Sequence, residues 1–271
     1  MKTLVGALCA VLLTLVPFVA AVAAPLKLVI HEESGAEGEP LPPISRYAAL
    51  RRALETALTR PVEITLTRDR QRVYEWMERN QADVFMTNAA DLAARALTSL
   101  GYNFIATARP DVTVLFIGKG APVDNLKALS GFAISMPKPE TMFGQVCTAE
   151  LRDFIAKQYT ARASSEYAAV VYAVENNLSP VGCIPSHSRA RDTLQAKGIK
   201  VVYEGRPQPA LPVIASLGLP AADRAAIAKV LTNFEEGAAG DSALKSLGVT
   251  GFTEGGETRL RMLNSWLKGT K

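Results

Sequence analysis

The chain has 271 residues, with 30 Lys and Arg against 26 Asp and Glu, so its net charge at pH 7 is only +4. The charges are scattered, with no basic run and no patch of interleaved aromatic residues, which excludes nucleic acid as an expected partner. Hydrophobic residues make up 48% of the chain, which is ample for the core of one large α/β domain or of two smaller lobes.

Residues 1–23 have the pattern of a secretory signal peptide. Lys2 is followed by an apolar run from Leu4 to Val22, and Ala21-Val22-Ala23 is an A-x-A cleavage pattern. No basic cluster flanks the run to stop transfer, so a cleaved peptide is favoured over a retained membrane anchor. No later apolar stretch is long enough to span a bilayer. The sequence therefore predicts a mature protein that starts at Ala24 and folds in the periplasm.

Strand and helix patterns alternate after the expected cleavage site. Residues 26–30 form a short strand signal, and Ser45 is the expected N-cap of an amphipathic helix that carries Tyr47. The next elements are strand 62–67, helix 73–77, strand 83–86, a helix capped by Asn88, and strands 102–106 and 112–117. This order predicts a parallel sheet with right-handed crossovers.

The same alternation then begins a second time. Strand signals lie at 132–135, 181–184, 199–203 and 213–217, with helical patterns around 151–155, 167–174, 188–196, 220–234 and 260–267. Two similar α/β units in succession imply two lobes, and a cleft between lobes is a usual place for a small ligand.

Five segments along the chain have a family resemblance. They are Tyr47-Ala-Ala-Leu, Val62-Glu-Ile-Thr-Leu, Ala82-Asp-Val-Phe-Met-Thr-Asn, Leu126-Lys-Ala-Leu-Ser-Gly-Phe-Ala-Ile-Ser and Ser179-Pro-Val-Gly-Cys. In this order they resemble segments of the periplasmic substrate-binding proteins of ABC transporters for phosphate, phosphite or phosphonate. The resemblance covers most of residues 26–235.

The resemblance implies a type 2 periplasmic-binding-protein fold, in which each of two α/β lobes is a mainly parallel sheet flanked by helices. Lobe 1 would be residues 24–108 plus 210–271, and lobe 2, residues 109–209, would be inserted into it through two crossing strands. The implied function is the capture of a small, anionic ligand, a phosphonate- or phosphate-like oxyanion, by hinge closure for an ABC importer. The alternative is a sensory binding protein that presents a ligand, such as a metal or metalloid, to a membrane sensor kinase. Either way we expect a monomer.

Candidate ligand-binding residues lie where predicted strands end and helices begin, because ligands of open α/β sheets meet these edges. They are His31, Thr87, Asn88, Lys138, Thr141, Glu166, Tyr167 and His187, together with Tyr47 at the start of the first helix. Helix packing is the alternative for Tyr47, and plain solvation is the alternative for Lys138.

Three of these positions depart from the family pattern, and the first is the family's strand-end Gly-Pro pair, which is here Thr87-Asn88. The family's Ser/Thr-rich turn for oxyanions is here Met136-Pro-Lys-Pro-Glu-Thr-Met-Phe-Gly, in which Thr141 is the only hydroxyl. Its Ser-His pair is here Ser165-Glu166, and the Glu166 carboxylate would repel a phosphonate. The resemblance therefore supports the family's fold for this chain better than it supports the family's ligand.

The sequence also bears on metal binding, disulfide formation and catalysis. His31 and His187, with Glu32, Glu33 and Glu166, could hold a metal between the lobes, but without a tight ligand spacing two polar loop histidines are favoured. Cys147 and Cys183 predict a disulfide, with a metalloid-binding dithiol or two buried thiols as alternatives. The motifs of Ser hydrolases, zinc proteases, P-loop and dinucleotide enzymes are absent, so we expect neither an enzyme nor a cofactor.

Overall fold

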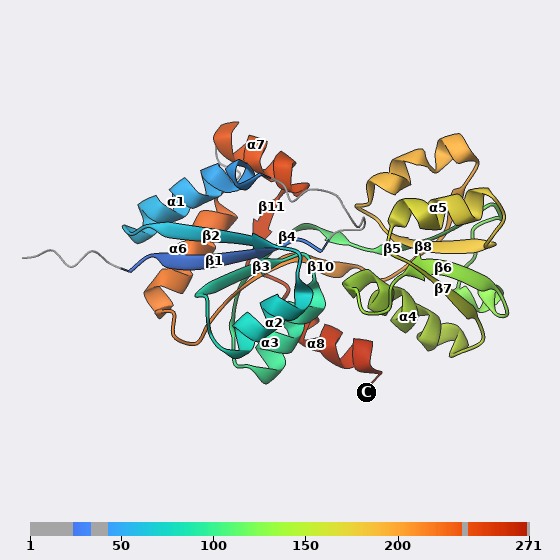
Figure 1. Ribbon diagram of the computed structural model, residues 1–271, viewed down its shortest axis with the longest axis horizontal. Helices are drawn as coiled ribbons and strands as arrows, with labels where there is room; N and C mark the ends of the chain where they lie inside the picture. The colour runs from blue at the N-terminus through green and yellow to red at the C-terminus, as the bar shows by residue number, and fades with distance from the viewer. Residues whose placement is uncertain (1–23, 34–42, 235–237, 270–271) are drawn as a thin grey trace, which may run out of the picture.

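The computed structural model describes residues 24–33, 43–234 and 238–269, so the expected signal peptide lies outside the described residues. Two mixed sheets flanked by helices form the two halves of the molecule (Figure 1). We call the first sheet with its helices the first lobe, and the second sheet with its helices the second lobe. The predicted α/β class is confirmed. None of the described helices is both long enough and apolar enough to cross a bilayer.

The first sheet combines a parallel half with an antiparallel half. Its strand order is β11 (Gly251–Thr253), β4 (Asn103–Val112), β10 (Gln208–Ala215), β3 (Val84–Thr87), β1 (Leu26–His31) and β2 (Val62–Thr67). Strands β2, β1 and β3 run parallel, whereas β10, β4 and β11 pair antiparallel. The parallel half therefore sends the residues that follow β1 and β3 to the same edge.

Alternating side chains of the first sheet bury two apolar faces. Leu28 and Ile30 of β1 pack with the helices of one face, and Val29 packs with those of the other face. The first face is covered by α1 (Ala48–Leu58), α6 (Ala221–Thr232) and α7 (Ala238–Leu247), with the short helix η1 (Ile44–Tyr47) before α1. The other face is covered by α2 (Arg70–Glu78), α3 (Ala90–Ser99) and α8 (Glu257–Lys268).

The second sheet has the same mixed plan. Its order is β7 (Thr160–Ser164), β6 (Ala133–Pro137), β8 (Val181–Pro185), β5 (Val114–Gly118) and β9 (Lys200–Glu204), with β7, β6 and β8 parallel and β5 antiparallel to both of its neighbours. Helix α4 (Met142–Ile155) covers one face, and α5 (Tyr167–Glu175) covers the other. Short 3-10 helices complete the lobe: η2 (Leu126–Leu129), η3 (Arg189–Thr193) and η4 (Gln195–Lys197).

The chain passes between the two sheets twice. Strand β4 of the first sheet continues through Thr113 into β5 of the second, and β9 returns through residues 205–207 into β10. Strand β10 shifts its register along β4, and Leu211 within this irregular stretch has a φ of 40°. Such a left-handed, bulged position in a connecting strand is a place where a backbone can bend.

Two helix starts differ from the sequence prediction. Ser45 caps nothing, because η1 is preceded by Pro43 and the N-cap of α1 is Tyr47, neither with a side-chain cap bond. Asn88 does not cap α3, whose N-cap is Ala89, because its amide is engaged with the backbone of Glu33. Ser45 lies inside η1 and so not at a helix start, whereas the Asn88 side chain finds its partner elsewhere in the fold.

Several short elements also differ. The helix expected at 188–196 consists of the two 3-10 helices η3 and η4. Strands β7 and β11 and helix α7 were not predicted. Strand β7 is an edge strand with mostly exposed residues, and β11 has only 3 residues, so neither has an apolar pattern that a sequence would reveal.

Candidate ligand cleft

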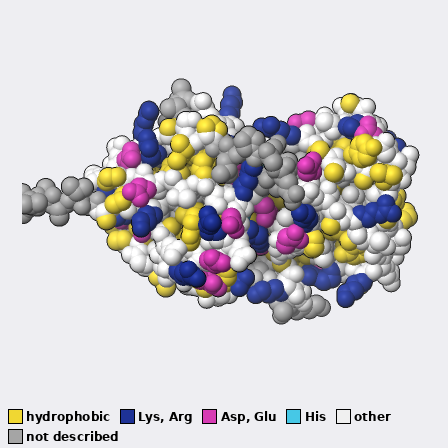
Figure 2. Space-filling model, in the orientation of Figure 1, with side chains coloured by type: hydrophobic (Ala, Val, Ile, Leu, Met, Phe, Trp, Pro, Cys, Tyr) yellow, Lys and Arg dark blue, Asp and Glu magenta, His cyan; other side chains and the backbone are white. Residues whose placement is uncertain are grey.

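A cleft of about 900 Å³ lies between the lobes, and residues that follow strands of both sheets line it. From the first lobe come Glu32 and Glu33 after β1, and Asn88 after β3. From the second lobe come Glu166 and Tyr167 after β7, and Ser186 and His187 after β8. The cleft therefore has the position that open α/β sheets give to ligands. Figure 2 shows basic and acidic side chains interspersed over the visible face, with no broad patch of one sign.

Glu33 is held rigidly at the first-lobe wall. Its backbone N–H donates to Asn88 Oδ1 at 2.6 Å, and Asn88 Nδ2 donates back to the Glu33 carbonyl at 2.9 Å. Its carboxylate pairs with Arg70, with Nη1 to Oε1 at 3.0 Å, and Arg70 also pairs with Asp91. This wall thus presents carboxylates that are already neutralised by a cation of the same lobe.

Tyr47 orients the neighbouring carboxylate from below the surface. Its ring is buried, and its hydroxyl donates to Glu32 Oε1. Burial and the hydrogen bond with Glu32 both raise the pKa of Tyr47, so the phenol stays protonated. Arg46 Nη1 lies 3.2 Å from the same carboxylate. Tyr47 therefore supports a cleft residue and does not itself line the cleft.

His31 and Thr87 lie beneath the cleft and do not line it, since both side chains are fully buried. His31 Nδ1 is 2.9 Å from Thr87 Oγ1, which also accepts from the Ala89 N–H at 3.0 Å. Burial, and then the charge of Arg70, lower the pKa of His31 from 6.5 to about 4. The imidazole is therefore neutral at pH 7, and its Nε2 has no hydrogen-bond partner among the described residues.

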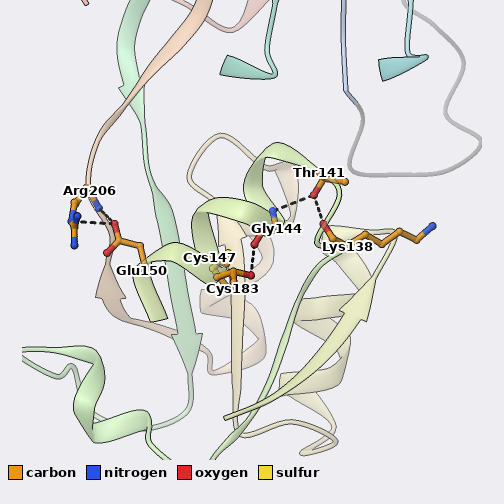
Figure 3. Close-up of a disulfide and its surroundings, with 8 residues drawn as sticks. Lys138, Thr141, Gly144, Cys147, Glu150, Cys183 and Arg206 are labelled. Carbon is orange, nitrogen blue, oxygen red and sulfur yellow. Dashed lines mark hydrogen bonds and ion pairs between the residues drawn. A yellow bond between two sulfur atoms is a disulfide. The ribbon is translucent and has the colours of Figure 1, made fainter. Parts of the chain in front are cut away.

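The N-terminus of α4 is capped by the chain's own groups. Thr141 Oγ1 accepts from the Gly144 N–H at 3.1 Å and donates to the Lys138 carbonyl at 2.7 Å (Figure 3). Gly144 must be glycine here, because a Cβ would lie 2.0 Å from that carbonyl oxygen. The Lys138 side chain points away from α4 in Figure 3, and neither Lys138 nor Thr141 lines the cleft.

The remaining second-lobe wall combines a helix start with aromatic rings. Glu166 occupies the N-cap position of α5, but its side chain makes no capping hydrogen bond. Glu166 and Tyr167 both line the cleft. Burial and the charge of Glu33 raise the pKa of Tyr167. The His187 ring lies 5.1 Å from the Phe143 ring, and although solvent reaches it, the surrounding cleft walls lower its pKa.

Basic residues of the cleft were missed by the sequence analysis. Arg189 and Arg191 follow the strand-end pair Ser186-His187 within a few residues, which is the one signal that could have indicated them, and Lys245 comes from the end of α7. Among the described residues these three cations form no ion pair, and Arg191 only donates to the Ser186 carbonyl at 3.3 Å. Because Glu32 and Glu33 are already paired, the described residues that line the cleft carry an excess of positive charge without an ion-pair partner among them.

The cysteines tie α4 to β8 in the second lobe. Cys147 and Cys183 form a disulfide, as the sequence predicted, with Cα atoms 6.4 Å apart and both side chains buried (Figure 3). The bond fixes the helix to the strand that leads to Ser186 and His187. Within residues 24–33, 43–234 and 238–269, no three His, Cys, Asp or Glu side chains are grouped closely enough to hold a metal ion.

The family model "ABC transporter, phosphonate, periplasmic substrate-binding protein" matches residues 43–258. The chain belongs to this family. Members are the binding components of ABC transporters and work in the periplasm, which is a binding role and not an enzymatic one. No curated protein matches the sequence significantly.

Solved structures share the fold at low sequence identity. XAC2383 from Xanthomonas citri, bound to ATP, has a TM-score of 0.70 at 17% identity, over 90% of this chain and 97% of that chain. PhnD1 from Prochlorococcus marinus, in complex with methylphosphonate, has a TM-score of 0.70 at 11% identity, over 91% and 98%. PA3383 from Pseudomonas aeruginosa, a component of an ABC phosphonate transporter, has a TM-score of 0.61 at 14% identity, over 90% and 87%. At these identities the likeness concerns the fold, and it agrees with the type 2 periplasmic-binding-protein architecture predicted from the sequence.

Proposed function

We propose that this substrate-binding protein captures a small oxyanion of the phosphonate or phosphate type between its lobes and delivers it to an ABC permease. The observation that carries this proposal is the charge state of the cleft. Arg189, Arg191 and Lys245 line it without ion pairs among the described residues, whereas Glu32 and Glu33 are each paired with an arginine. An anion entering the cleft gains from these cations and meets little unneutralised acid.

Helix starts of the second lobe add to the attraction for an anion. The N–H groups in the first turn of a helix have no partner within the helix, and the positive end of the dipole favours a negative ligand. Helix α5 begins at the cleft, with its N-cap side chain making no cap bond. Glu166 opposes an anion there, so we assign the main attraction to the arginines.

The volume of the cleft bears on the size of the ligand. About 900 Å³ is at the upper end of the range for small-molecule sites. Phosphate or methylphosphonate would leave much of this space to water. The proposal therefore includes organic phosphonates and phosphate esters, in keeping with the ATP and methylphosphonate bound to the related structures.

Closure would occur about the two segments that connect the sheets. The chain crosses through Thr113 and through residues 205–207, and the left-handed Leu211 lies in the cleft wall next to the second crossing. A ligand that contacts both walls binds the closed form better and shifts the population toward it. In this proposal the permease reads that closed form, and the protein acts as a monomer in the periplasm.

Calorimetry on the purified mature protein tests the ligand class, using phosphate, phosphite, methylphosphonate, ATP, a sulfonate and an alkylamine. We expect binding of at least one phosphorus oxyanion and none of the amine. Small-angle scattering at saturating ligand tests closure, for which we expect a smaller radius of gyration. Binding of the amine alone, or an unchanged scattering profile, would contradict the proposal.

A further inference from the structure

The Glu33 carboxylate reaches from the first lobe to the start of a helix in the second. Its Oε2 accepts from the backbone N–H of Met142 at 2.9 Å, a contact between residues 109 positions apart. Met142 is the first residue of α4, so its N–H has no acceptor within the helix. The carboxylate therefore occupies a helix N-terminus of the second lobe, where an anion is favoured.

This carboxylate is held firmly in place. Its other oxygen is 3.0 Å from Arg70 Nη1, its side chain is only 11% exposed, and Asn88 fixes its backbone from both sides. A second bridge runs beside it, because Asp91, which also pairs with Arg70, accepts from Gln145 Nε2 at 3.3 Å. Two carboxylates joined by one guanidinium thus contact the first turns of α4 from the opposite lobe.

The preceding residue provides a matched contrast. Glu32 has the same side chain and also lines the cleft, but its carboxylate bonds Tyr47 and Arg46, both of the first lobe, and no second-lobe residue among those described. Removing its charge would disturb the first lobe without breaking a contact between the lobes. A variant of Glu33 loses both a carboxylate and a contact between the lobes, whereas a variant of Glu32 loses only a carboxylate. Comparing the two variants therefore isolates the effect of the contact between the lobes.

We propose that Glu33 is a tethered competitor for the ligand, whose carboxylate bridges the lobes until an incoming oxyanion takes its place at α4 and closes them further. This inference rests on the proposed function, because it assumes that the ligand is an anion. A single N–H cannot serve two anions that repel each other, so the ligand must displace the carboxylate to use Met142. Because Glu33 is tethered, its effective concentration is high, and a weakly charged ligand is excluded.

The test compares wild-type mature protein with Glu33→Ala, Glu33→Gln and the control Glu32→Ala, without ligand and with methylphosphonate or inorganic phosphate. Without ligand, we expect Glu33→Ala to have a larger radius of gyration than wild type, and Glu32→Ala to be unchanged. Calorimetry should show about tenfold tighter binding of the probe by Glu33→Ala, which is at the low end for losing a charge-assisted competitor. Glu33→Gln keeps an acceptor without the charge, so it should shift both readouts less and in the same direction.

Two results would overturn the proposal: an unchanged ligand-free radius in Glu33→Ala, or weaker probe binding by this variant, which would make Glu33 a ligand contact. If Glu33→Ala does not fold, the radius and affinity of Glu33→Gln decide in the same way. A larger ligand-free radius with no binding of either probe by any variant would overturn the competition together with the anionic function. This result would support only the part of the proposal in which Glu33 bridges the lobes.

Discussion

The two walls of the cleft handle charge in opposite ways. The first lobe presents acidic residues, but Glu32 and Glu33 are paired with Arg46 and Arg70 and are fixed by buried neighbours. The second lobe presents Arg189 and Arg191 without ion pairs among the described residues. The acidic and basic residues of the chain nearly balance, so their numbers alone would predict a nearly neutral cleft. Which ligand the cleft favours therefore depends on how its charges are paired and not on their number.

The walls are also fixed by different means. The second lobe joins α4 to β8 by the Cys147–Cys183 disulfide. The first lobe relies on noncovalent contacts under its wall, with neutral His31 buried against Thr87. The stability of the two lobes should therefore respond to different perturbations, and the charges of the two walls should affect ligand binding differently.

The largest effect is expected from the disulfide of the second lobe. Replacing both Cys147 and Cys183 by Ala should lower the free energy of unfolding by about 3–4 kcal/mol, given the separation of 36 residues. Urea unfolding of the variant beside reduced and oxidised wild type measures this loss. Mass analysis of the unreduced protein should show two hydrogens missing. Two free thiols that arsenite protects would contradict the disulfide and favour the metalloid alternative.

The next effect concerns His31 of the first lobe. Because its pKa falls from 6.5 to about 4 on folding, the unfolded chain binds the proton more tightly than the native protein. The stability contribution is therefore complete above pH 6.5 and is lost as the pH falls toward 4, by about 3 kcal/mol in total. Urea unfolding from pH 7 to 4 should show this slope in wild type and a flatter one in His31→Asn.

His187 provides the control in the second lobe, because solvent reaches its side chain. His187→Asn should change the pH dependence of unfolding less than His31→Asn does. Equal effects of the two substitutions would contradict the contrast between a buried histidine and one in an open cleft wall.

Ligand binding should depend on the arginines of the second lobe. Arg189→Ala and Arg191→Ala should each weaken binding of the phosphorus oxyanion by roughly 1.5–3 kcal/mol, the range for a hydrogen bond to a charged group. Lys119→Ala is the control, since Lys119 bonds Glu175 and Asn177 away from the cleft. Calorimetry also measures Lys138→Ala, for which we expect a smaller loss. A loss at Lys138 as large as at Arg189 would favour the site predicted from the sequence.

The smallest effect is expected at Glu166. Glu166→Gln should strengthen oxyanion binding by roughly 0.3–1 kcal/mol, the range for a charge near a helix terminus, because a like charge leaves the cleft. Glu175→Gln at the other end of α5 should leave the affinity unchanged. Weaker binding by Glu166→Gln would indicate a ligand that carries an amine.

Much of the architecture could be predicted from the sequence. Apolar periodicity identified most helices and strands, because a buried face imposes its repeat on the residues that form it. After the expected signal peptide the sequence has only two cysteines, Cys147 and Cys183, so each had one possible partner there. Strand ends indicated which segments would meet the cleft, since parallel strands bring their carboxyl ends to one edge. The helix caps expected at Ser45 and Asn88 were wrong, because Ser45 lies inside η1 and the Asn88 side chain bonds the Glu33 backbone instead.

The α/β fold, its division into two sheets and its family could therefore be predicted from local sequence patterns. Which strand-end residues face the cleft depends on the packing of the whole fold, which buries His31 and Thr87 and exposes Arg189. The same packing sets which charges are neutralised, and it brings Glu33 to Met142 across 109 positions. Local patterns arise from neighbours along the chain, whereas ion pairing and desolvation depend on distances through space between segments that the fold alone brings together.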